Sequence, residues 1–170
     1  MERIKTLYSK EIMEHFRHPR NVGKMQDYSG LGKAGNLLCG DVLWLYIKVR
    51  KDKKGREIIK QASFETLGCA IAIANTSLIT TIVKGKTLEE AMKITREDLL
   101  KKLGKVPPFK IHCSVLAVDA LKEAIYDYYL KNKIEIPPDL EKEHQRIIKT
   151  KEELEKRYKE FQIFEKEILK

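Results

Sequence analysis

The 170-residue chain contains only three cysteines, and no Cys-x-x-Cys or His-x-x-x-His pair occurs in it. Structural zinc fingers are built from such closely spaced pairs, so their absence excludes that class of site. An odd number of widely spaced cysteines also argues against a disulfide framework. The alternative of three buried core cysteines does not fit their polar neighbours. We therefore interpret the cysteines as metal ligands or reactive thiols.

Long apolar runs are missing as well. No run approaches the roughly 18 residues that a membrane-spanning helix needs, and residues 1–6 lack the apolar stretch of a secretory signal. We therefore expect a cytoplasmic protein with no membrane partner. The length and a hydrophobic content of 42% are typical of a domain with a real core.

The net charge of +9 is unevenly distributed. Residues 137–170 carry nine basic and nine acidic side chains, whereas residues 1–136 carry 25 basic and 16 acidic ones. A basic domain attracts nucleic acid, acidic proteins or an anionic cofactor. Because the lysines are scattered and no aromatic-basic motif accompanies them, we expect no nucleic-acid partner.

The first half of the chain predicts one helix and a small sheet. Apolar residues at helical spacing indicate a helix over residues 8–16, which His18 and Pro19 end. The glycine-rich stretch 23–40 is interpreted as a loop. Residues 42–49 and 58–66, rich in β-branched and aromatic residues, predict two strands joined by a turn, so that two or three antiparallel strands result.

The second half predicts helices. Residues after Cys69 are apolar nearly all round up to Gly85, which indicates a buried helix. Thr87 and Glu90 form a capping-box pattern at the next helix. Residues 96–103 predict a short helix, residues 106–110 an exposed extended segment because of their two prolines, and residues 114–130 the longest helix of the core. The predicted class is α+β, a small antiparallel sheet with helices packed on one side.

Two cysteines are predicted at helix starts. Cys69 and Cys113 each directly precede a predicted helix, where unpaired amide donors and the macrodipole favour thiolate over thiol. His112 precedes Cys113 in what is expected to be an extended loop, so both side chains could reach one metal or exchange a proton.

Five side chains form the candidate ligand set. Soft sulfur ligands favour zinc, copper(I) or iron–sulfur clusters, whereas imidazole and carboxylate are harder and exchange more readily, so the mixture suits a site that holds metal temporarily. The ligands are far apart in the chain and must converge through folding. The set is Cys39, Asp41, Cys69, His112 and Cys113.

These residues stand within motifs that resemble the IscU and NifU N-terminal-domain family of iron–sulfur cluster assembly scaffolds. The resemblance covers residues 6–131 in one order. The matching elements are residues 8–23, Cys39-Gly40-Asp41, Thr66-Leu67-Gly68-Cys69, Val83-Lys84-Gly85-Lys86, Pro107-Pro108-Phe109-Lys110 and His112-Cys113-Ser114.

The resemblance implies a scaffold, not an enzyme, on which a [2Fe-2S] cluster is assembled from iron and sulfur and handed to apo-proteins. It implies cluster ligation by the three cysteines, with Asp41 or His112 completing the set, and Cys113 as the acceptor of persulfide sulfur from a cysteine desulfurase of the IscS/NifS type. Tyr8 matches a tyrosine associated with persulfide reduction and dimer contacts. The implied partners also include a ferredoxin-type electron donor.

The chain departs from the family at two places. Ala70-Ile71 stands where the family usually has Gly-Ser. In the segment of Pro107, Pro108 and Lys110, which the family uses to bind a partner, Val106 and Phe109 replace the usual residues, so recognition by an Hsp70-type chaperone stays open.

Two other functions use the same residues. A zinc-bound sulfur acceptor or carrier of the SufU kind would hold zinc in this site, although the chain has no room for the insertion typical of those proteins. A cysteine-dependent transferase would use Cys113 as nucleophile, His112 as base and Asp41 as the group that orients the base.

Residues 137–170 lie outside the resemblance and predict a charged helical extension to the domain of residues 1–136. One heptad position is apolar throughout, but the second is mostly polar, so a full coiled coil is not expected. The narrow seam would pack onto its own core or onto a second protomer, which leaves a homo-oligomer open; the alternative is an arm that recruits a partner protein. The seam residues are Leu140, Ile147, Leu154, Phe161 and Ile168.

Overall fold

The structure is a computed structural model that describes residues 7–36 and 40–168. It confirms the predicted α+β class with a helical C-terminal extension. No described helix is both long and apolar enough to cross a bilayer. The elements are α1 (Lys10–Arg17), β1 (Gly30–Asn36), β2 (Asp41–Lys51), β3 (Glu57–Leu67), α2 (Ala70–Ile82), α3 (Leu88–Met92), α4 (Arg96–Leu103), the 3-10 helix η1 (Pro108–Lys110), α5 (Ile111–Lys131) and α6 (Pro138–Ile168).

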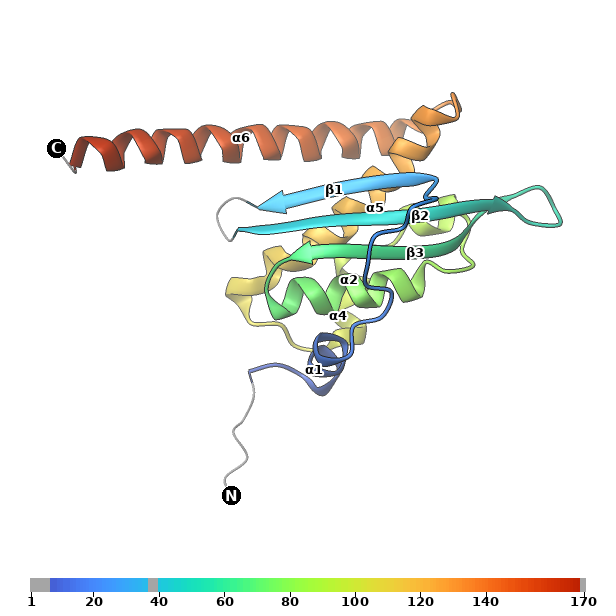
Figure 1. Ribbon diagram of the computed structural model, residues 1–170, viewed down its shortest axis with the longest axis horizontal. Coiled ribbons are helices and arrows are strands. Elements are labelled where there is room, and N and C mark those ends of the chain that lie inside the picture. Colours follow the sequence, from blue (N-terminus) through green and yellow to red (C-terminus); the bar gives the residue numbers. More distant parts are fainter. Residues whose placement is uncertain (1–6, 37–39, 169–170) are drawn as a thin grey trace, which may run out of the picture.

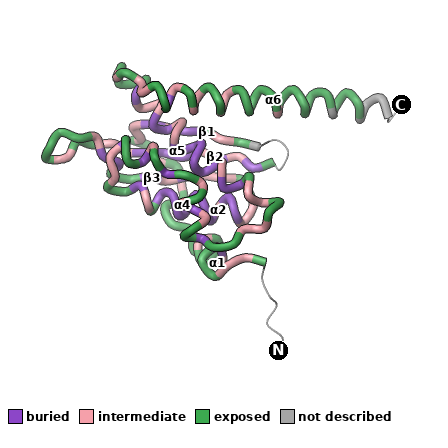
Figure 2. Tube along the Cα trace, turned by 180° about the vertical axis from the view of Figure 1, so that it is seen from behind, coloured by how far each residue is buried: buried purple, intermediate pink, exposed green. Residues whose placement is uncertain are grey.

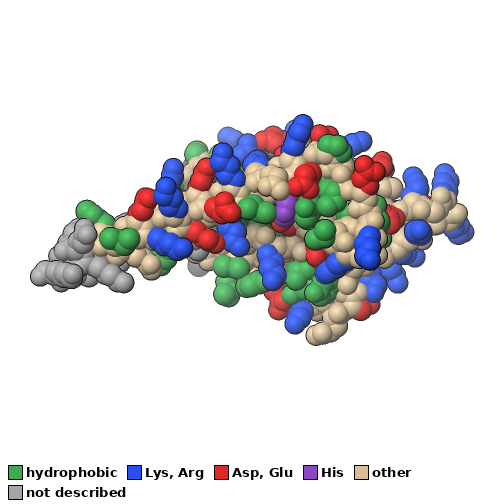
Figure 3. All heavy atoms as spheres, turned by 90° about the horizontal axis from the view of Figure 1, so that it is seen from above, with side chains coloured by type: hydrophobic (Ala, Val, Ile, Leu, Met, Phe, Trp, Pro, Cys, Tyr) green, Lys and Arg blue, Asp and Glu red, His purple; other side chains and the backbone are tan. Residues whose placement is uncertain are grey.

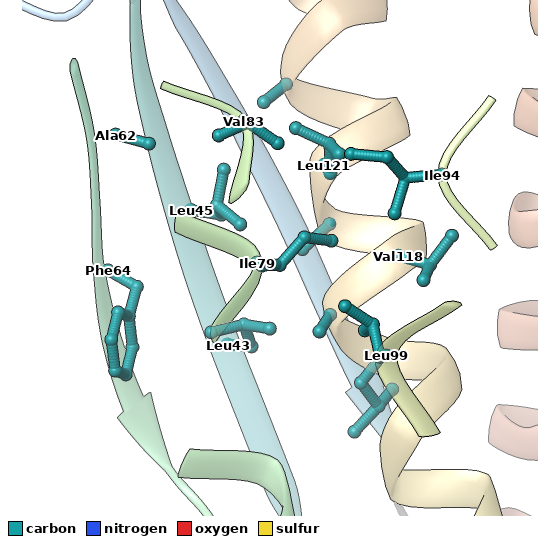
Figure 4. Packing of buried hydrophobic residues seen from close by; sticks show 14 of the residues in the cluster. Leu43, Leu45, Ala62, Phe64, Ile79, Val83, Ile94, Leu99, Val118 and Leu121 are labelled. Atoms are coloured by element: carbon teal, nitrogen blue, oxygen red, sulfur yellow. The ribbon is translucent and has the colours of Figure 1, made fainter. Parts of the chain in front are cut away.

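The three strands form one antiparallel sheet in the order β1-β2-β3, and helices α2 and α5 pack against one face of it (Figure 1). Alternate residues of β2 and β3 point to that face, among them the fully buried Leu45 and Phe64. They meet Ile79 of α2 and Leu121 of α5 in one hydrophobic core (Figure 4). This core fixes the ends of the strands and the starts of the two helices relative to one another.

The sequence predicted that the whole glycine-rich stretch is a loop, and this is wrong for part of it. Gly30 to Asn36 form the edge strand β1. The glycines of this strand allow a close approach to α5. A Cβ atom built on Gly32 would overlap the backbone carbonyl of Ala120, and one on Gly30 would overlap that of Ala124. Glycine therefore serves packing here, and a strand without large side chains gave no alternating pattern to detect.

The predicted helices α2, α3 and α4 are confirmed, and the capping box of Thr87 with Glu90 is present at α3. The segment before α5 differs from the prediction. Pro108 to Lys110 form a 3-10 helix, which is compatible with proline at its first position because that residue needs no amide donor. α5 then begins at Ile111, so His112 and Cys113 lie in its first turn.

Helix α6 runs antiparallel to α5 along the edge of β1 and ends beyond the sheet (Figure 1). Its start is anchored by Leu140, which is 3% exposed, whereas most of its later residues are exposed (Figure 2). Acidic and basic side chains are interspersed over the face seen from above (Figure 3). Between α6 and α5, Arg146 pairs with Asp119 at 2.6 Å.

Candidate metal centre

Three of the predicted ligands meet at one end of the sheet. Asp41 begins β2, Cys69 is the N-cap residue of α2, and Cys113 lies in the first turn of α5 (Figure 1). Their ligand atoms all lie within 4.8 Å of one another, and the two sulfur atoms are 3.4 Å apart. Among the described residues, this is the one group of three or more such side chains close enough to share a metal.

Asp41 is held against the start of a helix. The backbone N–H of Cys69 donates to Oδ1 of Asp41 at 3.2 Å, which satisfies one of the open amide groups at the start of α2. The side chain is buried, with 4% of the residue exposed, and Oδ2 has no hydrogen-bond partner in the described structure. A buried, unpartnered carboxylate oxygen beside two thiols fits a site that receives a cation.

The Cys113 thiol differs from the sequence-based expectation of a thiolate. Burial, above all, and the neighbouring Cys69 and Asp41 raise the pKa of Cys113 well above its usual value. The favourable helix start is therefore outweighed by loss of solvent and by nearby acidic groups. Because metal ligation requires the thiolate, a cation entering the site would displace this proton.

Lys110 brings positive charge to the site. Acidic groups near it raise the pKa of its ammonium group through the negative charge they carry when ionised, Cys69 most and then Cys113, Asp41 and Tyr8. The residue is half-buried at the end of η1, directly before α5. The sequence analysis predicted Lys110 only as a partner-binding residue. Nothing in the sequence showed that its charge lies beside the ligands.

A buried polar pair supports the two cysteine-bearing helices, and sequence reasoning missed it. Nδ2 of Asn75 in α2 donates to Oγ of Ser114 in α5 at 3.3 Å, and both residues are fully buried. Asn75 carries the one side-chain amide of the largely buried helix α2, and Ser114 follows Cys113 directly. A polar residue at a core position of a buried helix is the signal that could have revealed the pair.

His112 is not part of the ligand group. It was predicted to share an extended loop with Cys113, but successive residues of a helix do not face each other, so the two side chains diverge. His112 is exposed and lines a cleft between α5, β1 and α6. This geometry does not assemble the His112–Cys113 pair that a cysteine-dependent transferase would need.

The other residues predicted for the site lie outside the described residues, beside the core or at η1. Cys39 lies outside the described residues, so its assignment as a ligand stays a prediction. Tyr8 is half-buried and packs against the core just before α1. Pro107 and Pro108 lie at η1, where the neighbouring Phe109 is 66% exposed, and their binding of a partner also stays a prediction.

The fold and this ligand group agree with the protein family that the sequence comparisons identify. The chain belongs to the family of the NifU-like N-terminal domain, which matches residues 7–135. It is 49% identical over 126 residues to each of two iron–sulfur cluster assembly scaffold proteins IscU of Archaeoglobus fulgidus, covering 74% of this chain and 79% of each relative. To the IscU scaffold of Aquifex aeolicus it is 41% identical over 124 residues, covering 73% and 77%.

Solved structures give the same fold. A protein assigned as a cluster assembly scaffold of the SUF system in Fervidobacterium islandicum AW-1 superposes with a TM-score of 0.56 at 26% identity, covering 69% of this chain and 96% of that one. A NifU-like N-terminal protein of Brucella abortus gives 0.57 at 20% identity, covering 72% and 94%. The chain is thus a member of the IscU/NifU family of iron–sulfur cluster assembly scaffolds, and α6 lies beyond the matched region.

Proposed function

We propose that this chain assembles a [2Fe-2S] cluster at Asp41, Cys69 and Cys113 and passes it to apo-proteins. The observation that carries the proposal is the convergence of these side chains, which come from three distant segments of the sequence, to within 4.8 Å. Cys39 completes the proposed ligand set. The cluster is cargo rather than a resident cofactor, and the chain acts as a platform rather than as an enzyme.

The charge balance at the site supports a cluster that can leave. A [2Fe-2S] core of about +2 held by three thiolates and one carboxylate carries about −2 overall, and low solvent exposure makes that charge costly. Lys110 lies where its ammonium group offsets part of it. Asp41 supplies the harder ligand, which exchanges with water or an incoming ligand more readily than a thiolate does.

Cys113 is proposed as the sulfur acceptor. Once the site opens to solvent, the Cys113 thiol would lose its proton to water. The resulting thiolate would attack the outer sulfur of a cysteine desulfurase persulfide, forming a new S–S bond while the donor cysteine leaves as thiolate. A ferredoxin-type donor would then supply the two electrons that release the outer sulfur as sulfide. Cys113 is fully buried, so transfer requires the structure around it to open, and the exposed Phe109 of the adjacent η1 is the proposed contact point for the partner.

The test of the function is anaerobic reconstitution of the full chain with Fe²⁺ and sulfide. We expect visible absorption of a [2Fe-2S] cluster, equal amounts of iron and sulfide, and transfer to an apo-ferredoxin. Cys69→Ser at the start of α2 should abolish all three. The matched control is Thr81→Ser, at an exposed position near the other end of the same helix, which should behave as wild type. A wild-type chain that binds no iron under these conditions would defeat the proposal.

A zinc-bound sulfur carrier is the second candidate, because the two thiols and the carboxylate that converge here are also ligands of zinc. Metal analysis of protein purified anaerobically, followed by transfer of labelled sulfur without iron, separates the two functions. A stable zinc protein that transfers sulfur but never holds a cluster would favour the carrier.

The remaining proposals concern the cellular location of the chain, its partner proteins and the role of Tyr8. We place the chain in the cytoplasm with a cysteine desulfurase and apo-acceptor proteins as partners. Pro107, Pro108 and Lys110 form the proposed partner-binding segment, for a desulfurase or an Hsp70-type chaperone. Tyr8 is proposed to act in persulfide reduction or in contacts between protomers of a homo-oligomer.

A further inference from the structure

The sulfur atoms of Cys69 and Cys113 lie in direct contact. They are 3.4 Å apart, although 44 positions of the chain separate the two residues. Two atoms about 3–3.5 Å apart stand at the distance from which a bond between them can form. The thiols are therefore a pair that can react with each other, in addition to being ligands of one metal.

Helices hold this pair in place. Cys69 is the N-cap residue of α2 and Cys113 lies in the first turn of α5, so the starts of two packed helices set the positions of the sulfur atoms (Figure 1). The hydrogen bond from Asn75 to Ser114 joins the same two helices inside the core. The backbone of Cys69 is also fixed, because its N–H donates to Oδ1 of Asp41. The contact between the sulfur atoms is thus a property of the fold.

The side chain of Cys69 is available for a reaction. An N-cap side chain commonly accepts a hydrogen bond from its own helix, but that of Cys69 makes no capping bond and contacts the Cys113 sulfur instead. Cys69 is half-buried, whereas Cys113 is fully buried. Within the described part of the chain, a persulfide on Cys113 would therefore have one thiol beside it, that of Cys69.

We propose that Cys69 resolves the persulfide formed on Cys113 while the site holds no metal. The Cys69 sulfur attacks Sγ of Cys113, and a disulfide bond forms between the two residues. The bond between Sγ and the outer sulfur breaks, and the outer sulfur leaves with the electron pair of that bond. It takes up the proton of the Cys69 thiol and departs as hydrogen sulfide, so one persulfide and one thiol give one disulfide and one hydrogen sulfide.

The inference rests on the proposed acceptance of sulfur by Cys113 and adds a chemical role for Cys69. Iron bound to Cys69 would occupy the electron pair that the attack requires, so an iron-loaded site keeps its persulfide for the electron donor proposed above. An empty site discharges its sulfur and is left as a disulfide. Two electrons from the same donor and two protons from water then restore both thiols, which the site needs before it can bind metal.

The experiment follows one round of sulfur transfer without metal. A purified cysteine desulfurase is charged with one equivalent of cysteine, freed of small molecules and mixed anaerobically with the full chain and a chelator. Released sulfide is measured over time, and mass spectrometry of thiol-blocked, non-reduced peptides locates persulfide and disulfide. For the wild type we expect as much sulfide as sulfur transferred, and a disulfide that joins Cys69 to Cys113. Cys69→Ser should keep the persulfide on Cys113 and release sulfide at least about tenfold more slowly.

Two controls accompany this experiment. Thr81→Ser, at an exposed position near the other end of α2, should behave as wild type. Wild type mixed with uncharged desulfurase should form no disulfide, and a disulfide there would overturn the inference because the transferred sulfur would not be its cause. If Cys69→Ser is too disturbed to take up sulfur, the peptide map of the wild type decides alone.

A wild-type chain that keeps its persulfide until an electron donor is added would overturn the inference and leave the proposed function standing. The same holds if Cys69→Ser releases sulfide as fast as the wild type, or if the disulfide links Cys113 to Cys39. Sulfur that never reaches Cys113 would overturn the proposed acceptance step itself, and the role of Cys69 with it.

Discussion

Asp41 carries the chemistry of the site at the scale of single residues. One of its oxygens organises the start of α2 through the Cys69 N–H, and the other is buried without a partner among the described residues. Because the second oxygen makes no hydrogen bond, Asp41 can bind a metal while the first oxygen keeps its bond to the Cys69 N–H. The carboxylate is also the least tightly binding member of the group, which makes it the point at which a cluster can open.

Replacing Asp41 by Ala should therefore prolong the life of the cluster and slow its transfer. The variant loses the exchangeable ligand, and another group near the site completes the coordination. Cluster lifetime and the rate of transfer to an apo-ferredoxin are to be compared under the same anaerobic conditions. Asp27→Ala, at an exposed carboxylate that pairs with Lys48, is the matched control. Equal lifetimes and equal rates would show that Asp41 serves only to accept the Cys69 N–H at the start of α2.

The residues of the site were largely predictable, but their geometry was not. Asp41, Cys69 and Cys113 are recognisable because each stands in a motif with small or polar neighbours. The position of His112 was misjudged because the sequence gives no sign that the helix begins at Ile111, before rather than after the cysteine. The raised pKa of Cys113 depends on burial, a property of the assembled core.

At the scale of elements, β1 shows how packing overrides local propensity. Glycine is unfavourable in a strand, yet Gly30 and Gly32 are required because the backbone of α5 passes directly over them. The prolines before α5 did not decide the local structure either. Both a 3-10 helix and an extended segment accept proline, so the sequence could not distinguish the two. Helices with capping boxes, such as α3, were predictable because their signals are local.

Gly32→Ala should lower the free energy of unfolding by about 1–3 kcal/mol, since the new methyl group overlaps the carbonyl of Ala120. Gly35→Ala in the same strand is the control. A Cβ there meets nothing closer than 3.5 Å, so the change should stay within about 1 kcal/mol. Denaturant unfolding of the metal-free proteins gives both values. Equal stability of the two variants would show that β1 and α5 are not in close contact.

The pair of Arg146 with Asp119 predicts a pH-dependent effect. Burial raises the pKa of Asp119, so its ionised form is the less favourable one in the folded protein, and its contribution to stability falls as pH rises through that pKa. Arg146 opposes this shift. Arg146→Gln should thus cost about 1 kcal/mol at pH 7, a modest value because the arginine is partly exposed, and less at pH 4.5.

Urea unfolding of the wild type and the variant at both pH values measures that difference, with Arg157→Gln on an exposed turn of α6 as control. Comparing variants at one pH cancels the titration of groups that Arg146 does not contact. Arg146 also pairs with Glu143 at 3.0 Å, but the pKa of Glu143 is lowered, so Glu143 is largely ionised at both pH values and its part of the loss changes little between them. A loss of stability that is as large at pH 4.5 as at pH 7 would show that Asp119 is not the group whose charge Arg146 balances.

At the scale of the whole molecule, the chain consists of a domain that matches the family and the helix α6, which lies outside that match. The family match ends at residue 135 and α6 begins at Pro138, close to the boundary between residues 136 and 137 that was predicted where the resemblance ends. The division into two units stays a prediction, because Leu140 of α6 belongs to the same hydrophobic core as the sheet and α5. The seam predicted from its heptad spacing is buried at Leu140 and half-buried at Ile147 and Leu154.

Deleting residues 138–170 tests this arrangement. None of the proposed ligands lies beyond Cys113, so the truncated protein should still bind one cluster, but it should unfold at a lower temperature because Leu140 and the charged pairs along α5 are lost. Deleting residues 155–170 alone is the matched control, since it retains Leu140, Ile147 and Leu154 and should leave the melting temperature nearly unchanged. Iron and sulfide content, calorimetry and size-exclusion chromatography give the three readouts. A change in oligomer size on either deletion would place the exposed turns of α6 between protomers, and a truncated protein that binds no cluster would make α6 part of the site.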